Sequence, residues 1–93
     1  MNTYYVFPFD LSHASKGSYR DCKRLAEDLI YTGQFDALYV ARSRAGEPDA
    51  TVILEFQSRG YKQFSALKRL SRDALQQACK RRPFLFDGNE QGA

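Results

Sequence analysis

The only histidine of the chain, His13, is the first residue to consider for chemistry, because an imidazole titrates near neutral pH and can act as a general acid or base. Asp10 and Ser15 lie close to it in sequence. An Asp-His pair at the end of a strand would be a minimal catalytic arrangement. No second group of titratable residues converges on His13, so we interpret it as a solvated loop residue. An enzyme that uses His13 and Asp10 is kept as a minority hypothesis.

The two cysteines, Cys22 and Cys79, are the other residues with reactive side chains. Cys22 shares the apolar side of a helical pattern with Leu25 and Leu29, where a thiol behaves as a small hydrophobic group. One histidine and two distant cysteines provide no closely spaced ligand pair for zinc. We therefore expect reduced cysteines, no metal site and no cofactor.

Basic residues are concentrated in one segment, residues 59–82. The formal net charge of the whole chain is +3. This segment contains eight lysines and arginines against the single acidic residue Asp73, a net charge of +7, whereas the rest of the chain has a net charge of −4. Such an uneven distribution favours an acidic macromolecule as a partner, and nucleic acid is the favoured one.

We predict a small non-catalytic binding protein that contacts phosphates through a basic helix, the second of two predicted helices, over residues 60–82. The residues expected to make these contacts are Lys62, Lys68, Arg69, Arg72, Lys80 and Arg81. The structural alternative is that an amphipathic helix needs a solvated face, which lysine and arginine supply as good helix formers. The functional alternative is an inhibitor or accessory regulator of the antitoxin or mobile-element (phage) kind, which binds an acidic protein surface through the helix or the open sheet face.

The third predicted strand, over residues 51–57, argues against a standard RNA-recognition motif. Such a motif stacks bases on aromatic residues of its third strand. Alternation turns Val52, Leu54 and Phe56 inward and leaves no aromatic residue outward. On the first strand, Tyr5 and Phe7 share a face. We expect them to serve a core, a protein partner or a homodimer formed through the sheet.

Local patterns predict six elements. Strands are expected where aromatic and β-branched residues alternate, and helices where apolar residues recur every three or four positions. The predicted order is a strand over 3–9, a helix over 19–32, a strand over 35–42, a strand over 51–57, a helix over 60–82 and a short strand over 84–86. Ser18 and Gly33 mark the two ends of the first helix as an N-cap and a C-terminal glycine.

This order, β-α-β-β-α-β, predicts an α+β fold of the ferredoxin-like kind, an antiparallel sheet with two helices on one face. A three-stranded sheet with residues 84–86 as a loop is the alternative. The chain of 93 residues is expected to form one domain over residues 1–87, followed by a disordered tail over 88–93. No signal sequence or apolar run of membrane-spanning length is visible, so no membrane association and a cytoplasmic location are expected.

Overall fold

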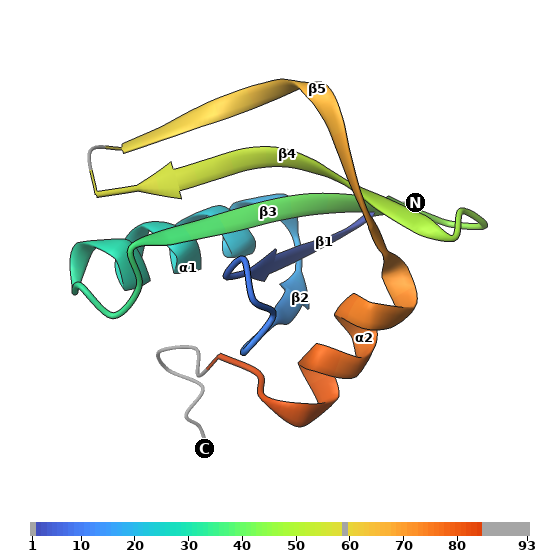
Figure 1. The fold of residues 1–93 in the computed structure, drawn as a ribbon, viewed down its shortest axis with the longest axis horizontal. Helices are drawn as coiled ribbons and strands as arrows, with labels where there is room; N and C mark the ends of the chain where they lie inside the picture. Colours follow the sequence, from blue (N-terminus) through green and yellow to red (C-terminus); the bar gives the residue numbers. More distant parts are fainter. Residues whose placement is uncertain (1, 59, 85–93) are drawn as a thin grey trace.

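The computed structural model describes residues 2–58 and 60–84, with residues 60–67 described by their backbone alone (Figure 1). In chain order the elements are β1 (Asn2–Phe7), β2 (Ser15–Gly17), α1 (Tyr19–Tyr31), β3 (Ala37–Arg44), β4 (Asp49–Gln57), β5 (Gly60–Ser71) and α2 (Arg72–Arg81). The strands form a single sheet in the order β2-β1-β3-β4-β5, and every neighbouring pair is antiparallel.

The predicted α+β class with an antiparallel sheet is confirmed, but the ferredoxin-like topology is wrong. The observed order is β-β-α-β-β-β-α. One added strand is β2, which lies in a polar segment predicted as a loop. It pairs with β1 through Tyr4↔Gly17 and Val6↔Ser15. Backbone hydrogen bonds to β1 make this segment a strand, although its side chains show no strand pattern.

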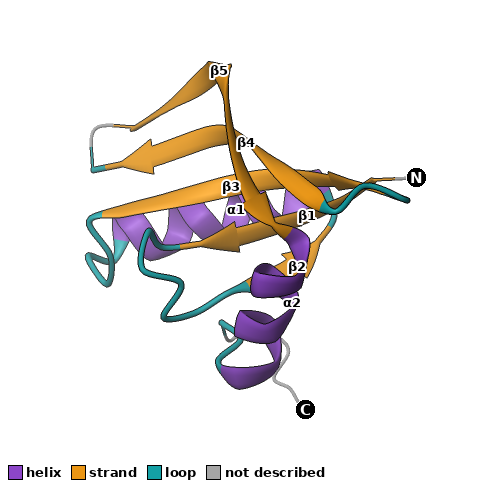
Figure 2. Ribbon diagram, turned by 45° about the vertical axis from the view of Figure 1, so that its right-hand side comes forward, coloured by secondary structure: helices purple, strands orange, loops and turns teal. Residues whose placement is uncertain are grey.

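The second added strand, β5, replaces the first half of the predicted second helix. Residues Gly60–Ser71 pair with β4, with Tyr61 opposite Phe56 and Leu70 opposite Ala50. Helix propensity is a weak preference, and the unpaired edge of β4 offers this segment a ladder of backbone hydrogen bonds. Figures 1 and 2 both show β5 bending midway and leading into α2.

Both helices begin at a serine cap. In α1 the Ser18 hydroxyl accepts a hydrogen bond from the Asp21 N–H at 3.1 Å, and Gly33 beyond its end has φ 79°, which confirms the predicted limits of this helix. In α2 the Ser71 hydroxyl accepts from the Ala74 N–H at 3.3 Å. α2 ends at Arg81, shortly before Pro83, which cannot continue a helix.

The two helices pack on opposite faces of the sheet, so the prediction that both lie on one face is wrong. Consecutive residues of a strand point to opposite faces. Val6 packs with residues of α1, whereas Tyr5 and Phe7 pack with Leu75 and Ala78 of α2. The sheet therefore has a buried core on each side.

A β-bulge lets two adjacent strands serve both cores. The register shifts between Val40 and Ala41 of β3, opposite Leu54 and Val52 of β4, which leaves Ile53 as the extra residue. Val52 faces α2, while Leu54 and Phe56 face α1. The predicted burial of these three side chains is confirmed, but they are divided between two faces.

The segment after α2 lies against the start of β2. The Ala14 N–H donates to the Arg82 carbonyl at 3.0 Å, and the Phe84 N–H donates to the buried hydroxyl oxygen of Ser15 at 2.7 Å. Phe84 is not part of a strand. The rest of the predicted last strand, residues 85 and 86, and the predicted tail over 88–93 lie outside the described residues.

Replacing Ser15 tests this attachment. The Ser15→Ala variant leaves the buried Phe84 N–H without its acceptor, so we expect the free energy of unfolding to fall by about 2 kcal/mol in urea titrations. Ser58→Ala, an exposed serine of the β4-β5 turn, is the matched control and should change stability little. Equal stability of the two variants would contradict the role given to Ser15.

Candidate nucleic-acid interface

The predicted basic residues do not share one helical face. Lys62, Lys68 and Arg69 belong to the strand β5, and the Lys62 side chain lies outside the described ones. Lys68 and Arg69 are exposed and consecutive, so their side chains point to opposite faces of the sheet. The structure thus separates two residues that a helix would have placed close together.

The remaining predicted contacts lie at the two ends of α2. Arg72 is the half-buried first residue of this helix, and its N–H donates to the Pro48 carbonyl at 2.9 Å. Lys80 and Arg81 are exposed in the last turn. A helix of ten residues is about 15 Å long, so these two groups are separated by most of its length. Cations in the last turn also stabilise the negative end of the helix dipole.

Arg69 instead belongs to a row of side chains that crosses four strands. Tyr4 of β1 lies opposite Arg42 of β3, Arg42 lies opposite Thr51 of β4, and Thr51 lies opposite Arg69 of β5. Directly opposed residues point to the same face, and neighbouring strands are about 4.8 Å apart. We call Tyr4, Arg42, Thr51 and Arg69 the arginine row. The backbone positions of Arg42 and Arg69 are two strands, or about 10 Å, apart.

The arginine row lies on the α1 side of the sheet. Tyr4 packs against the α1-side core and makes an edge-on contact with Tyr19, the first residue of α1, with ring centroids 5.4 Å apart. The first turns of α1 add further cations beside this tyrosine pair. A shallow hollow there is lined by Tyr19, Arg20, Lys23, Arg24 and Glu27.

The opposite end of the row is less basic. Arg69 shares a hollow with Glu47, Pro48 and Asp49 of the β3-β4 loop as well as with Thr51. These two acidic residues lower the local positive potential around Arg69. The electrostatically favourable part of the row for an anion is therefore its Tyr4 and Arg42 end, beside α1.

Arg69 is the one residue of the arginine row that the sequence predicted as a contact residue. Arg42 lies in a predicted strand, but its relation to Arg69 requires β5 to be a strand next to β4. A weak signal was available, because Arg42 and Arg44 are alternate residues of one strand and so share a face.

The structure places Tyr5 and Phe7 in the α2-side core. Their side chains are only 1% and 2% exposed. Neither ring is available to a partner protein or a second copy in this conformation. The homodimer remains a prediction that would need another surface.

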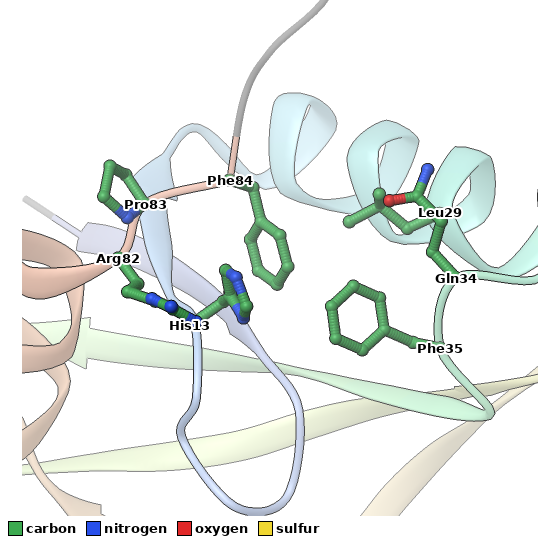
Figure 3. Close-up of a pocket in the computed structure, with 7 residues that line it drawn as sticks. All are labelled: His13, Leu29, Gln34, Phe35, Arg82, Pro83 and Phe84. Atoms are coloured by element: carbon green, nitrogen blue, oxygen red, sulfur yellow. The ribbon is translucent and has the colours of Figure 1, made fainter.

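His13 takes part in a cluster of rings at the edge of an open pocket of about 480 Å³ (Figure 3). Its ring stacks on Phe84 with centroids 5.4 Å apart and an angle of 18°, and Phe35 meets both rings edge-on. The pocket is lined by His13, Leu29, Gln34, Phe35, Arg82, Pro83 and Phe84. The rings pack on one another, and this packing helps to hold Phe84 against β2.

Asp10 and His13 each bond to Ser12, which lies between them in sequence. The Asp10 carboxylate accepts a hydrogen bond from the Ser12 N–H at 3.0 Å, and bonding to Ser12 lowers the pKa of Asp10. The Nδ1 atom of His13 lies 3.2 Å from the Ser12 hydroxyl. Within residues 2–58 and 60–84, no three metal-ligating side chains come together in a possible metal site.

Cys22 is buried in the α1-side core. Its Sγ donates to the Tyr4 carbonyl at 3.4 Å. Burial, with a smaller effect of the Asp21 carboxylate, raises the pKa of the Cys22 thiol to about 12. A thiol with this pKa is protonated at neutral pH and is a poor nucleophile.

No protein-family model, curated protein or solved structure matches this chain. Neither α1 nor α2, the two helices within the described residues, has the length and apolar character needed to cross a membrane.

The raised pKa of Cys22 predicts how the stability of the fold depends on alkaline pH. The folded state keeps the thiol proton up to a pKa of about 12, while the unfolded thiol loses it near its ordinary value of 9.0. This contribution to stability is complete below about pH 9 and is lost as the pH rises towards 12. Between pH 8 and about pH 10.5, wild type should lose about 2 kcal/mol more than Cys22→Ala in urea titrations.

The Cys79→Ala variant is the control, because it retains the Cys22 thiol. It should keep most of the alkaline loss of wild type, although half-burial also raises the pKa of Cys79. If wild type and Cys22→Ala lose the same free energy over this range, the Cys22 thiol is not protected by the core.

Proposed function

We propose that this protein is a nucleic-acid-binding protein whose arginine row contacts the phosphate backbone. The observation that carries the proposal is the register across β1, β3, β4 and β5, which aligns Arg42 and Arg69 on one face. A guanidinium group presents a planar set of donors that matches two phosphate oxygens. The sheet fixes the spacing of the two backbone positions from which these side chains extend.

The surroundings of the row support this proposal. Arg20, Lys23 and Arg24 lie on the first turns of α1, where Asp21 and Glu27 balance part of their charge. Tyr4 and Tyr19 provide aromatic surface beside these cations, and aromatic rings next to basic groups suit bases next to phosphates. The formal net charge of +3 favours approach to a polyanion.

The row has no glycine-aromatic signature for reading individual bases. Its donors are guanidinium and hydroxyl groups, which bind phosphate and sugar oxygens without regard to sequence. We therefore expect weak sequence preference and an affinity that falls as salt is added, because added salt makes the release of counterions from the nucleic acid less favourable.

A double charge reversal tests the interface. The variant Arg42→Glu with Arg69→Glu replaces two phosphate donors by acidic groups, so it should bind a fluorescein-labelled oligothymidine at least about tenfold more weakly at low salt. Fluorescence anisotropy at low and at physiological salt measures both the affinity and the salt slope. The slope should fall together with the affinity, because fewer counterions are released.

The variant Lys80→Glu with Arg81→Glu is the matched control. It changes the net charge by the same amount at the end of α2, away from the row. It should lose less affinity than the reversal in the row. Equal losses of affinity would mean that overall charge, and not the arginine row, decides binding. A larger loss in the control would place the binding surface on α2. The proposal is overturned by either result, or if wild type does not bind at low salt.

A further inference from the structure

The turn after β1 holds an aromatic ring in solvent. The side chain of Phe9 is 76% exposed, although it lies between the buried Pro8 and the half-buried Leu11. The Leu11 N–H donates to the Pro8 carbonyl at 3.0 Å, which closes the turn around Phe9. The Ser12 N–H donates to the Asp10 carboxylate at 3.0 Å, so this carboxylate is bonded back into the turn. Phe9 is therefore presented by an ordered loop.

The backbone of this turn adopts a conformation that its residues do not favour. Leu11 has φ 55°, in the left-handed region where a branched side chain is strained. The Leu11 side chain packs against the α2-side core, which offsets the strain. The packing of Leu11 thus fixes the direction in which the chain leaves β1, and with it the position of Phe9.

Two neighbours complete a platform around the exposed ring. Tyr39 of β3 lies beside Phe9 with centroids 6.5 Å apart, and Phe7 lies beneath Tyr39 at 6.0 Å. The Nζ atom of Lys68, from β5, lies over the Phe9 ring at 5.8 Å from its centroid. Three segments far apart in sequence thus bring an exposed ring, a half-buried ring and an exposed cation together, with Glu55 opposite Tyr39 on β4. We call Phe9, Tyr39 and Lys68 the aromatic platform.

The chemistry of the platform distinguishes between possible partners. An apolar pocket on another protein would bury the Phe9 ring but would also remove water from the Lys68 ammonium, at a large cost in free energy. A nucleotide satisfies both groups, because its base stacks on the ring while its phosphate binds the cation. A base inside a duplex is already stacked on its neighbours, so only an unpaired base has a face to offer.

We infer that the aromatic platform stacks an unpaired base of single-stranded nucleic acid. The inference rests on the proposed function and adds the class of nucleic acid. The platform and the arginine row lie on opposite faces of the sheet, but β5 is an edge strand. Lys68 and Arg69 are consecutive on that edge and point to opposite faces. A flexible single strand that passes over the edge of β5 reaches both residues, whereas a stiff duplex does not bend so sharply.

The test separates base stacking from phosphate binding. Two fluorescein-labelled probes of about 12 nucleotides are compared by anisotropy: an oligothymidine and a base-free sugar-phosphate chain of the same length. Phe9→Ala should weaken binding of the oligothymidine by about tenfold and leave binding of the base-free chain unchanged. Phe9→Trp should restore or strengthen oligothymidine binding, because a larger ring stacks better. A blunt duplex should bind wild type more weakly than the oligothymidine does.

Tyr31→Ala is the matched control, because Tyr31 is also an exposed aromatic residue, 91% exposed at the end of α1. It should leave the affinity for both probes unchanged. The inference is overturned if Phe9→Ala binds oligothymidine like wild type, or if Phe9→Ala weakens both probes equally. Retained binding by Phe9→Ala together with lost binding by the Arg42→Glu and Arg69→Glu variant would reject the platform and leave the proposed function standing. No binding of any probe by wild type would reject both.

Discussion

The antiparallel pairing of β4 with β5 is the interaction on which both candidate surfaces depend. It sets Arg69 opposite Thr51 and Lys68 opposite Val52, and thereby assigns the two cations to opposite faces. It also brings Ser71 to the point where α2 begins, so that the helix crosses beneath the α2 side of the sheet. If this segment were a helix, as its local pattern predicts, neither the arginine row nor the aromatic platform would exist.

The two-sided core explains why so little of the sheet is available to a partner. α1 covers one face and α2 the other, and the bulge at Ile53 lets β4 contribute Val52 to one core and Leu54 to the other. The arginine row lies on the α1 side, where Tyr4 contacts the first residue of α1, and the aromatic platform lies on the α2 side. Binding at either place requires no helix to move.

The sequence predicted the elements whose signals are local. The limits of α1 follow from Ser18, the apolar stripe and Gly33, and the β3-β4 hairpin follows from alternation on both sides of a Gly-Pro loop. It failed where the outcome depends on distant partners. Whether residues 60–71 form a helix or a strand is decided by the free edge of β4, and whether Tyr5 is open or buried is decided by the position of α2. Arg42 was missed for the same reason, because its importance appears only with the register.

Protection of a sheet edge is a structural reason for the cations of β5, but it does not apply to Arg42. Edge strands are protected from pairing with other chains by lysine and arginine and by bulges, and β5 has both, with Lys68, Arg69 and a register shift opposite Ile53. Arg42 lies on β3, in the middle of the sheet, where no edge needs protection. Arg42 is half-buried, and an arginine in such a place buries its aliphatic stem along the sheet while its charged head stays in water. Under the proposed function, this charged head would bind an anion together with Arg69.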